Sequence, residues 1–172
     1  MYKIFSKISR WLRHRLCELQ GIGVVELGGQ LSAVVIRDGV RENLGVICRK
    51  KVTTAFVEYL VDNLVAEESA FGDFKYHDSG IGATAENKTD TTLVTPWGGA
   101  RSVGSQEEGA TGEIYKSIAT TTYNATKAIQ EHGLFNIDTA GILMDRSVFA
   151  TINVVDTNQI EWTYQLTAVA ET

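Results

Sequence analysis

The sequence predicts a mainly β protein with α additions, specifically an antiparallel β-sandwich preceded by an amphipathic N-terminal helix and a second short helix. Two observations carry this prediction. From residue 71 onward, short segments rich in threonine, valine and aromatic residues, which favour half-buried strands, alternate with polar, glycine-rich stretches. The last such segment, QIEWTYQLTAV at 159–169, places an apolar side chain at every second residue, which is the period of a strand with one buried face.

The composition limits the classes of function. The chain has 172 residues, of which 44% are hydrophobic, enough for one domain with an ordinary core. Its 16 basic and 21 acidic residues give a net charge of −5, which argues against broad nucleic-acid binding. No stretch approaches the ~20 apolar residues of a membrane span, and we expect no membrane partner. Arginines interrupt residues 8–15, where a signal peptide would be apolar, and we expect Cys17 and Cys48 to be free thiols.

The first 20 residues, MYKIFSKISRWLRHRLCELQ, predict an amphipathic helix with five basic residues and one acidic residue. The helix must bury its apolar stripe on its own domain, on a neighbouring copy, on a larger acidic partner or on a membrane surface. We interpret residues 1–30 as a docking arm that ends in a glycine-rich linker at 21–30. Its expected partner-binding residues are Phe5, Ile8, Arg10, Trp11, Leu12, Arg13 and Leu16.

Residues 31–172 are predicted to form the sandwich domain. Asp38-Gly39 lies between two β-branched runs, which indicates a hairpin. The stretch TTAFVEYLVDNLVAEE places apolar residues on one face behind a possible Thr53 or Thr54 cap, so we expect a helix near 53–66.

Six further segments are predicted strands, with long polar loops between them at 80–90 and 98–112. We expect Trp97, which follows Pro96 in a loop, to contact another chain. The predicted strands are 74–78, 91–95, 113–123, 140–149, 151–155 and 159–169.

The stretch AIQEHGLFN at 128–136 contains the most reactive-looking pair, Glu131-His132. Together with Ser147 and Asp145 it suggests a small hydrolase, but adjacent residues on a strand point to opposite faces and share a proton poorly. We therefore interpret it as a structural corner in which a strand ends near Gln130 and the chain turns. In this corner Glu131 and His132 form a polar turn, Gly133 is a hinge, Leu134 and Phe135 enter the core, and Arg146 belongs to the same structural set.

The three histidines are separated by more than fifty residues, so we expect no metal site and no cofactor. We interpret His77-Asp78 as part of a turn.

Several segments together resemble a group of tailed-bacteriophage virion proteins, over about residues 52–169. They are FKYHDSGIGATAENKTDTTLVTP, RSVGSQ, YKSIATTTYNATKAIQEHGLFN and GILMDRSVFATINVVDTNQIEWTYQLT, in that order along the chain. The resemblance implies a structural protein of the virion, assembled in the host cytoplasm, and brings no catalytic residues.

Within that class we expect a capsid decoration or cement protein. A homotrimer could occupy local threefold positions of the shell and clamp the major capsid protein through the N-terminal region and the long loops. The alternative is a tail, collar or neck protein, because EHGLF-type corners also occur in proteins that resemble tail-collar and fibre components. A small hydrolase that uses His132 is the remote alternative.

Overall fold

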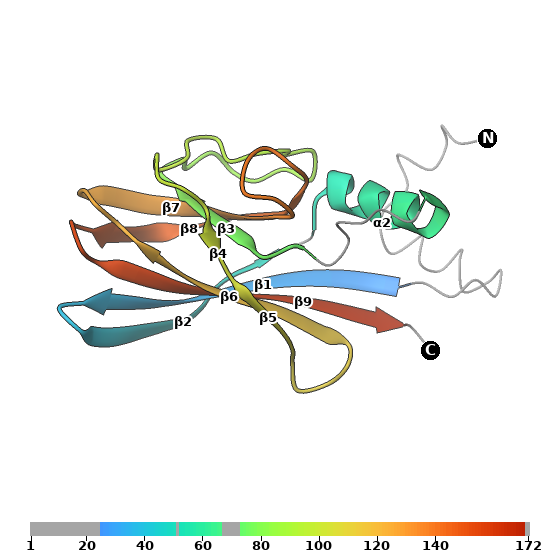
Figure 1. Ribbon diagram of the computed structural model, residues 1–172, viewed down its shortest axis with the longest axis horizontal. Helices are drawn as coiled ribbons and strands as arrows, with labels where there is room; N and C mark the ends of the chain where they lie inside the picture. Colours follow the sequence, from blue (N-terminus) through green and yellow to red (C-terminus); the bar gives the residue numbers. More distant parts are fainter. Residues whose placement is uncertain (1–24, 51, 67–72, 171–172) are drawn as a thin grey trace.

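The computed structural model of the protein describes residues 25–50, 52–66 and 73–170 (Figure 1). This part is mainly β, as predicted, and consists of two antiparallel sheets that enclose one core. The larger sheet has the strand order β2 (Val40–Lys50), β1 (Val25–Arg37), β9 (Gln159–Ala170), β6 (Ile114–Thr122) and β5 (Ser105–Glu108). The smaller sheet has the order β4 (Ser102–Val103), β3 (Tyr76–Gly80), β7 (Lys127–Phe135) and β8 (Leu143–Val154).

Strands β1 and β2 form the predicted hairpin. Arg37 pairs with Val40, so Asp38 and Gly39 make a two-residue turn, and both have positive φ values of 50° and 78°. Two positive φ values give a type I′ turn, whose twist matches that of the strands. The predicted linker is wrong from residue 25 onward, because Val25–Gln30 already belong to β1 and pair with the end of β9. These backbone hydrogen bonds need no apolar period, which is why the sequence pattern missed them.

The clearest predicted strand is confirmed as β9, at the centre of the larger sheet. It pairs with β1 on one side and β6 on the other, and its apolar alternation points into the core. Ile160, Trp162 and Tyr164 are completely buried. The indole Nε1 of Trp162 donates to Oγ1 of Thr121 on β6 at 3.2 Å, so its polar atom is satisfied inside the core.

The second predicted helix is also confirmed, as α2 (Thr54–Ala66). Thr53 is its N-cap, since Oγ1 of Thr53 accepts the backbone N–H of Phe56 at 3.2 Å. The same hydroxyl donates to the carbonyl of Leu143, which ties the start of the helix to β8. Phe56 packs edge-on against Phe74 with 5.0 Å between ring centroids.

Other boundaries differ from the prediction. Residues 91–95 are not a strand, and only Pro96 bridges to Gly80. The two segments at 140–149 and 151–155 form the single strand β8, while the predicted loop at 98–112 contains β4 and β5. His77 and Asp78 lie within β3 rather than in a turn. The errors at β3, β4 and β5 share a cause, because their polar residues favour turns or loops by local pattern although the structure pairs them in strands.

Gly133 is a position of close packing rather than a hinge. It lies within β7 opposite Asp78 on β3 and Arg146 on β8, and its φ is outside the left-handed region. A Cβ placed there would lie 2.9 Å from Cδ2 of Leu93 and 3.0 Å from Cδ1 of Leu143. A glycine is therefore required by the side chains above the strand, not by the backbone.

We expect Gly133→Ala to lower the free energy of unfolding by about 1–3 kcal/mol, because the added methyl group overpacks a filled site. Urea denaturation measures the change. Gly28→Ala is the matched control, since a Cβ at Gly28 on β1 would have no atom within 4 Å. Equal stability of the two variants would contradict the packing role.

Candidate functional site

Glu131 and His132 lie inside strand β7, so the predicted corner is wrong. Both side chains have 0% exposure, and β7 is paired on both sides, with β3 and with β8. Successive residues of the strand point to opposite faces, as expected. Glu131 faces the loop at 81–97, whereas His132 faces the larger sheet, 4.9 Å from the ring of Trp162. The two residues therefore belong to separate clusters.

The carboxylate of Glu131 is the centre of the first cluster. Its Oε1 accepts the backbone N–H groups of Gly82 at 3.1 Å and Thr95 at 2.7 Å. Its Oε2 accepts the N–H of Val94 at 3.1 Å and Nε of Arg146 at 2.7 Å. Four donors replace the water that a buried carboxylate loses, which is the condition for burying it at low cost.

Arg146 extends this cluster toward the middle of the same loop. From β8 it donates Nη1 to Oδ2 of Asp90 at 2.9 Å and Nη2 to the carbonyl of Thr84 at 3.0 Å. Burial opposes the charge of the guanidinium, but the hydrogen bonds with Glu131 and Asp90 outweigh it and raise the pKa of Arg146. Arg146 and Glu131 together hold residues 81–97 against the outer face of the smaller sheet.

A second arginine holds the neighbouring loop. Nη1 of Arg101 donates to the carbonyls of Ile137 and Ala140, each at 2.7 Å, and its guanidinium lies 3.4 Å from the ring centroid of Phe135. Nε of Arg101 lies 3.5 Å from Oδ2 of Asp78. Burial raises the pKa of Asp78, and Arg101 opposes that shift. The contact over Phe135 places a cation on an aromatic face, which favours arginine over lysine at this position.

His77 and His132 form a buried pair between the sheets. Nδ1 of His77 lies 3.0 Å from Nε2 of His132, and Nε2 of His77 lies 2.9 Å from Oγ of Ser117. Burial lowers the pKa of His77 to about 3 and that of His132 well below its usual range, so both rings are neutral. Nδ1 of His132 has no hydrogen-bond partner among the described residues. A buried ring nitrogen that lacks a hydrogen-bond donor destabilises the fold less than a buried N–H that lacks an acceptor. We therefore assign the proton of His132 to Nε2.

Asp145 and Ser147 on β8 form a third buried cluster. Oγ of Ser147 donates to Oδ1 of Asp145 at 2.7 Å. Oδ2 of Asp145 and the hydroxyl of Tyr164 both approach Gly29, where no side chain fills the space, and neither has a hydrogen-bond partner in the described part of the chain. Burial raises the pKa of Asp145 to about 6 and also raises the pKa of the Cys48 thiol.

These positions weigh against the hydrolase hypothesis. His132 and Ser147 are cross-strand neighbours on β7 and β8. However, His132, Asp145 and Ser147 are all buried, and Glu131 lies on the opposite face of β7, committed to Arg146 and backbone donors. A substrate cannot reach a nucleophile that is sealed between two sheets.

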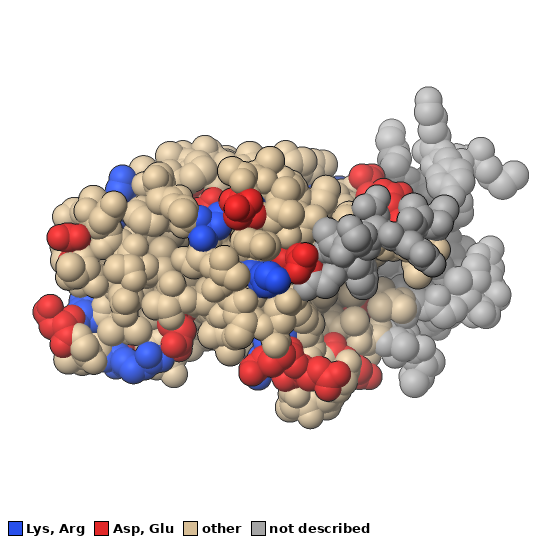
Figure 2. All heavy atoms as spheres, in the orientation of Figure 1, with Lys and Arg blue, Asp and Glu red and all other residues tan. Residues whose placement is uncertain are grey.

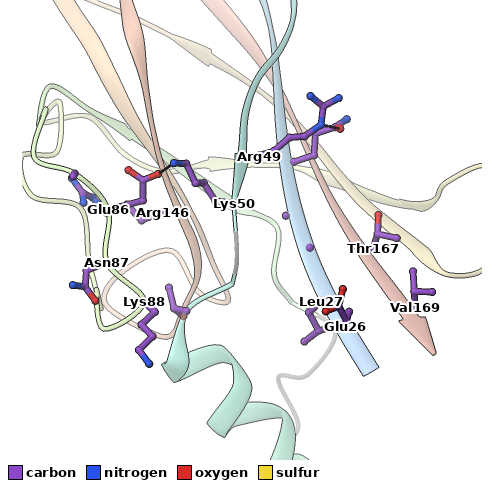
Figure 3. A pocket seen from close by; sticks show the side chains of 15 residues that line it. Glu26, Leu27, Arg49, Lys50, Glu86, Asn87, Lys88, Arg146, Thr167 and Val169 are labelled. Carbon is purple, nitrogen blue, oxygen red and sulfur yellow. Dashed lines mark hydrogen bonds and ion pairs between the residues drawn. The ribbon is translucent and has the colours of Figure 1, made fainter. Parts of the chain in front are cut away.

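An open groove lies at the end of the sandwich where β1 begins (Figure 3). Its volume is about 970 Å³, and β1 from Glu26 to Gln30, the end of β2, Thr53, the loop at 85–88 and the last residues of β9 line it. Lys50 on β2 forms an ion pair with Glu86 on the loop across the groove. The charges on its walls are mixed, which favours no single class of charged ligand.

The predicted partner-binding residues are not brought to this groove by the described structure. Trp97 is only 7% exposed and packs against Tyr123 with 4.9 Å between ring centroids, which leaves little of its side chain for the predicted contact with another chain. Its backbone N–H donates to the carbonyl of Ser79, which turns the side chain inward. Phe5, Ile8, Arg10, Trp11, Leu12, Arg13 and Leu16 lie outside the described residues.

Comparison with known proteins gives no relative, since no family model, no curated protein and no solved structure matches the chain. Among the described residues, no group of three or more histidine, cysteine, aspartate or glutamate side chains is placed to hold a metal ion. No helix in the described part is long and apolar enough to cross a membrane.

Sequence reasoning missed Asp78, Asp90 and Arg101 as members of the network. Asp90 lies in the segment TDTTLVTP and Arg101 in RSVGSQ, both of which belong to the resemblance described above. Charged residues that lie within the segments carrying the resemblance but offer no catalytic chemistry could have indicated a loop anchor.

We expect Arg146→Gln to lower the free energy of unfolding by about 3–5 kcal/mol, because it leaves the Glu131 carboxylate buried without its ionic partner. Chemical denaturation measures the loss, and amide exchange at Val94 and Thr95 should increase. Arg41→Gln is the control, because Arg41 and Glu161 form an exposed pair at 2.6 Å whose loss costs at most about 1 kcal/mol. Similar losses of free energy in both variants would show that the buried ion pair stabilises the protein no more than the exposed one does.

We expect Asp145→Asn to stabilise the protein at pH 7.5 by about 2–3 kcal/mol and to have little effect near pH 4. The folded state raises the pKa of Asp145 from 3.8 to about 6. Between these values the unfolded chain has lost the proton and the folded chain keeps it, so the contribution of Asp145 to wild-type stability falls as pH rises and levels off above about pH 6.

An asparagine keeps the acceptor for Ser147 and removes the titration. Denaturant unfolding of both proteins from pH 4 to pH 8 gives the difference, in which contributions from the buried histidines cancel. Asp156→Asn, at an exposed turn, is the control. A constant difference across this pH range would contradict the assignment.

Proposed function

We propose that this chain is a structural component of a tailed-bacteriophage particle, most specifically a capsid decoration or cement protein that bridges neighbouring capsid subunits. One observation carries the proposal. The segments that resemble phage virion proteins are far apart in sequence, and their charged residues meet in the network that fastens loops to the smaller sheet. That network contains Asp78, Asp90, Arg101, Glu131 and Arg146.

This use of charged residues suits a structural role. In an enzyme, a glutamate and an arginine of an active site keep atoms free for a substrate. Here Glu131 accepts four hydrogen bonds, and Arg146 donates to a carboxylate, a second carboxylate and a carbonyl, all within the chain. Their hydrogen-bonding capacity is used to fix the shape of residues 81–97.

A fixed loop layer favours repeated contacts on a particle surface, because a partner that binds it has no loop-ordering entropy to overcome. Figure 2 shows the charged side chains of one face in separate groups with uncharged residues between them, so this face has no continuous basic surface of the kind that binds phosphates. A trimer at local threefold positions of the shell, bound to the major capsid protein through the N-terminal region and the loops, is the assembly that we propose.

A tail, collar or neck protein remains the second candidate, because the resemblance includes EHGLF-type motifs of tail-collar and fibre components. The two candidates differ in copy number, since the shell and the tail have different symmetries.

We expect purified particles of the phage that encodes this chain to contain on the order of hundreds of copies, in proportion to the major capsid protein. Quantitative densitometry or mass spectrometry against the major capsid band measures this ratio. Roughly a dozen copies or fewer would assign the chain to the tail or neck instead. Complete absence from purified particles would contradict a virion role of either kind.

A further inference from the structure

Helix α2 exposes an apolar stripe along one side. Val57, Val61 and Leu64 follow one another at intervals of four and three residues, so they share a face of the helix. Their side chains are 43%, 55% and 87% exposed. The inward face is already occupied, because Phe56 and Tyr59 pack against Phe74. A stripe of this kind on a folded domain indicates a contact surface rather than chance exposure.

An acidic row runs beside this stripe. Glu58 and Asp62 each follow a valine of the stripe by one residue, and both are exposed. Helix α2 has no lysine, arginine or histidine between Thr54 and Ala66. The surface therefore suits a partner that has an apolar stripe with basic residues along its side.

Residues 1–20 of the same chain have this pattern. In the predicted N-terminal helix, Ile4, Ile8 and Trp11 share one face at intervals of four and three residues. A basic residue precedes each of them by one position, namely Lys3, Lys7 and Arg10. The spacing of the apolar row equals that of Val57, Val61 and Leu64, and the adjacent row carries the opposite charge.

The two segments also match in length and position. A helix over residues 4–19 would be roughly 24 Å long, and the 13 residues of α2 span roughly 20 Å. The described chain begins at Val25, and Glu26 and Leu27 line the same groove as Thr53, the residue before α2. Figures 1 and 3 both place the start of β1 and α2 at one end of the molecule. The intervening residues 20–24 thus need to bridge only the width of that end.

We propose that the stripe of Val57, Val61 and Leu64 is a docking surface for residues 1–20 of the same chain. The apolar rows pack against each other, and Lys3, Lys7 and Arg10 face Glu58 and Asp62. The proposal concerns the free protein and holds whether or not the chain belongs to a virion.

Tryptophan fluorescence provides the first test. Trp97 and Trp162 are buried in the core, so acrylamide quenching in the full chain reports mainly on Trp11. We expect Trp11 to be shielded in the wild type, and Val61→Glu to raise its quenching constant to the value for a peptide of residues 1–20. Val40→Glu, at a 71% exposed valine beside the β1–β2 turn, should leave quenching unchanged. A wild-type constant equal to the peptide value would overturn the proposal.

Charge exchange tests the acidic row. Glu58→Lys with Asp62→Lys should increase Trp11 quenching, and adding Lys7→Glu with Arg10→Glu should restore the shielding. Failure of the second pair to restore shielding would contradict the pairing of the two charged rows.

Crosslinking separates docking within one chain from docking on a second copy. Cys17 lies within the segment, and Cys48 is buried. In a Val61→Cys variant, a flexible bis-maleimide should join Cys17 to residue 61 and give a product with the mass of one chain. Val40→Cys, beside the β1–β2 turn that Figure 1 places at the opposite end of the sandwich from α2, should give none. A two-chain product, or no product at residue 61, would overturn docking within the chain.

Discussion

The buried ion pair between Glu131 and Arg146 is the constraint on which the smaller sheet depends. Both side chains leave water completely, and a pair so placed stabilises a fold only if its remaining hydrogen-bonding atoms are satisfied. The partners are supplied by the loop at 81–97 and not by neighbouring strands. The loop must therefore adopt one conformation whenever the sheet forms, and it replaces the helix or second sheet that usually covers such a face.

The buried ion pair and its loop also require small residues at several neighbouring positions. Gly80 and Gly82 approach the Glu131 side chain so closely that a Cβ at either position would collide with it, and Gly133 leaves room for Leu93 and Leu143. Leu93 packs with Phe135, Leu143 and Tyr76 in a small apolar cluster under the loop. The loop thus has its own core, separate from the one between the sheets. Releasing the loop would expose apolar surface as well as two charges.

The sequence predicted those parts of the fold that depend on local pattern. The alternation in β9, the Asp38-Gly39 turn and the capped helix α2 are properties of contiguous residues, and each is confirmed. The errors concern polar residues whose partners are distant in the chain. Glu131 meets residues 82, 94, 95 and 146, and His132 meets His77, so a polar turn was predicted where the structure has the interior of a strand. No local rule distinguishes an exposed glutamate from one whose charge is balanced 15 residues later.

Trp97 illustrates the same limit for an apolar residue. A tryptophan after a proline in a polar loop has the sequence features of a contact residue, but that loop is folded back onto the sheet by Glu131, and the indole is carried into the core beside Tyr123. A row of exposed apolar residues lies instead on α2, in an element that the sequence predicted correctly. Within that helix the structure leaves Leu64 87% exposed. A helical period identifies a face, but only the neighbouring elements decide whether that face is covered.

The two ends of the molecule differ in whether their side chains are already bound within the chain. Around the smaller sheet, charged and polar side chains are bound within the chain, so this region can present a shape but has few groups left for chemistry. At the end near α2, apolar side chains remain exposed beside acidic ones, and the hydrophobic effect favours covering them. Docking of residues 1–20 on α2 would bury this apolar surface, whereas the anchored loops restrict which surfaces fit against them, because ordered loops cannot adapt to a poor match.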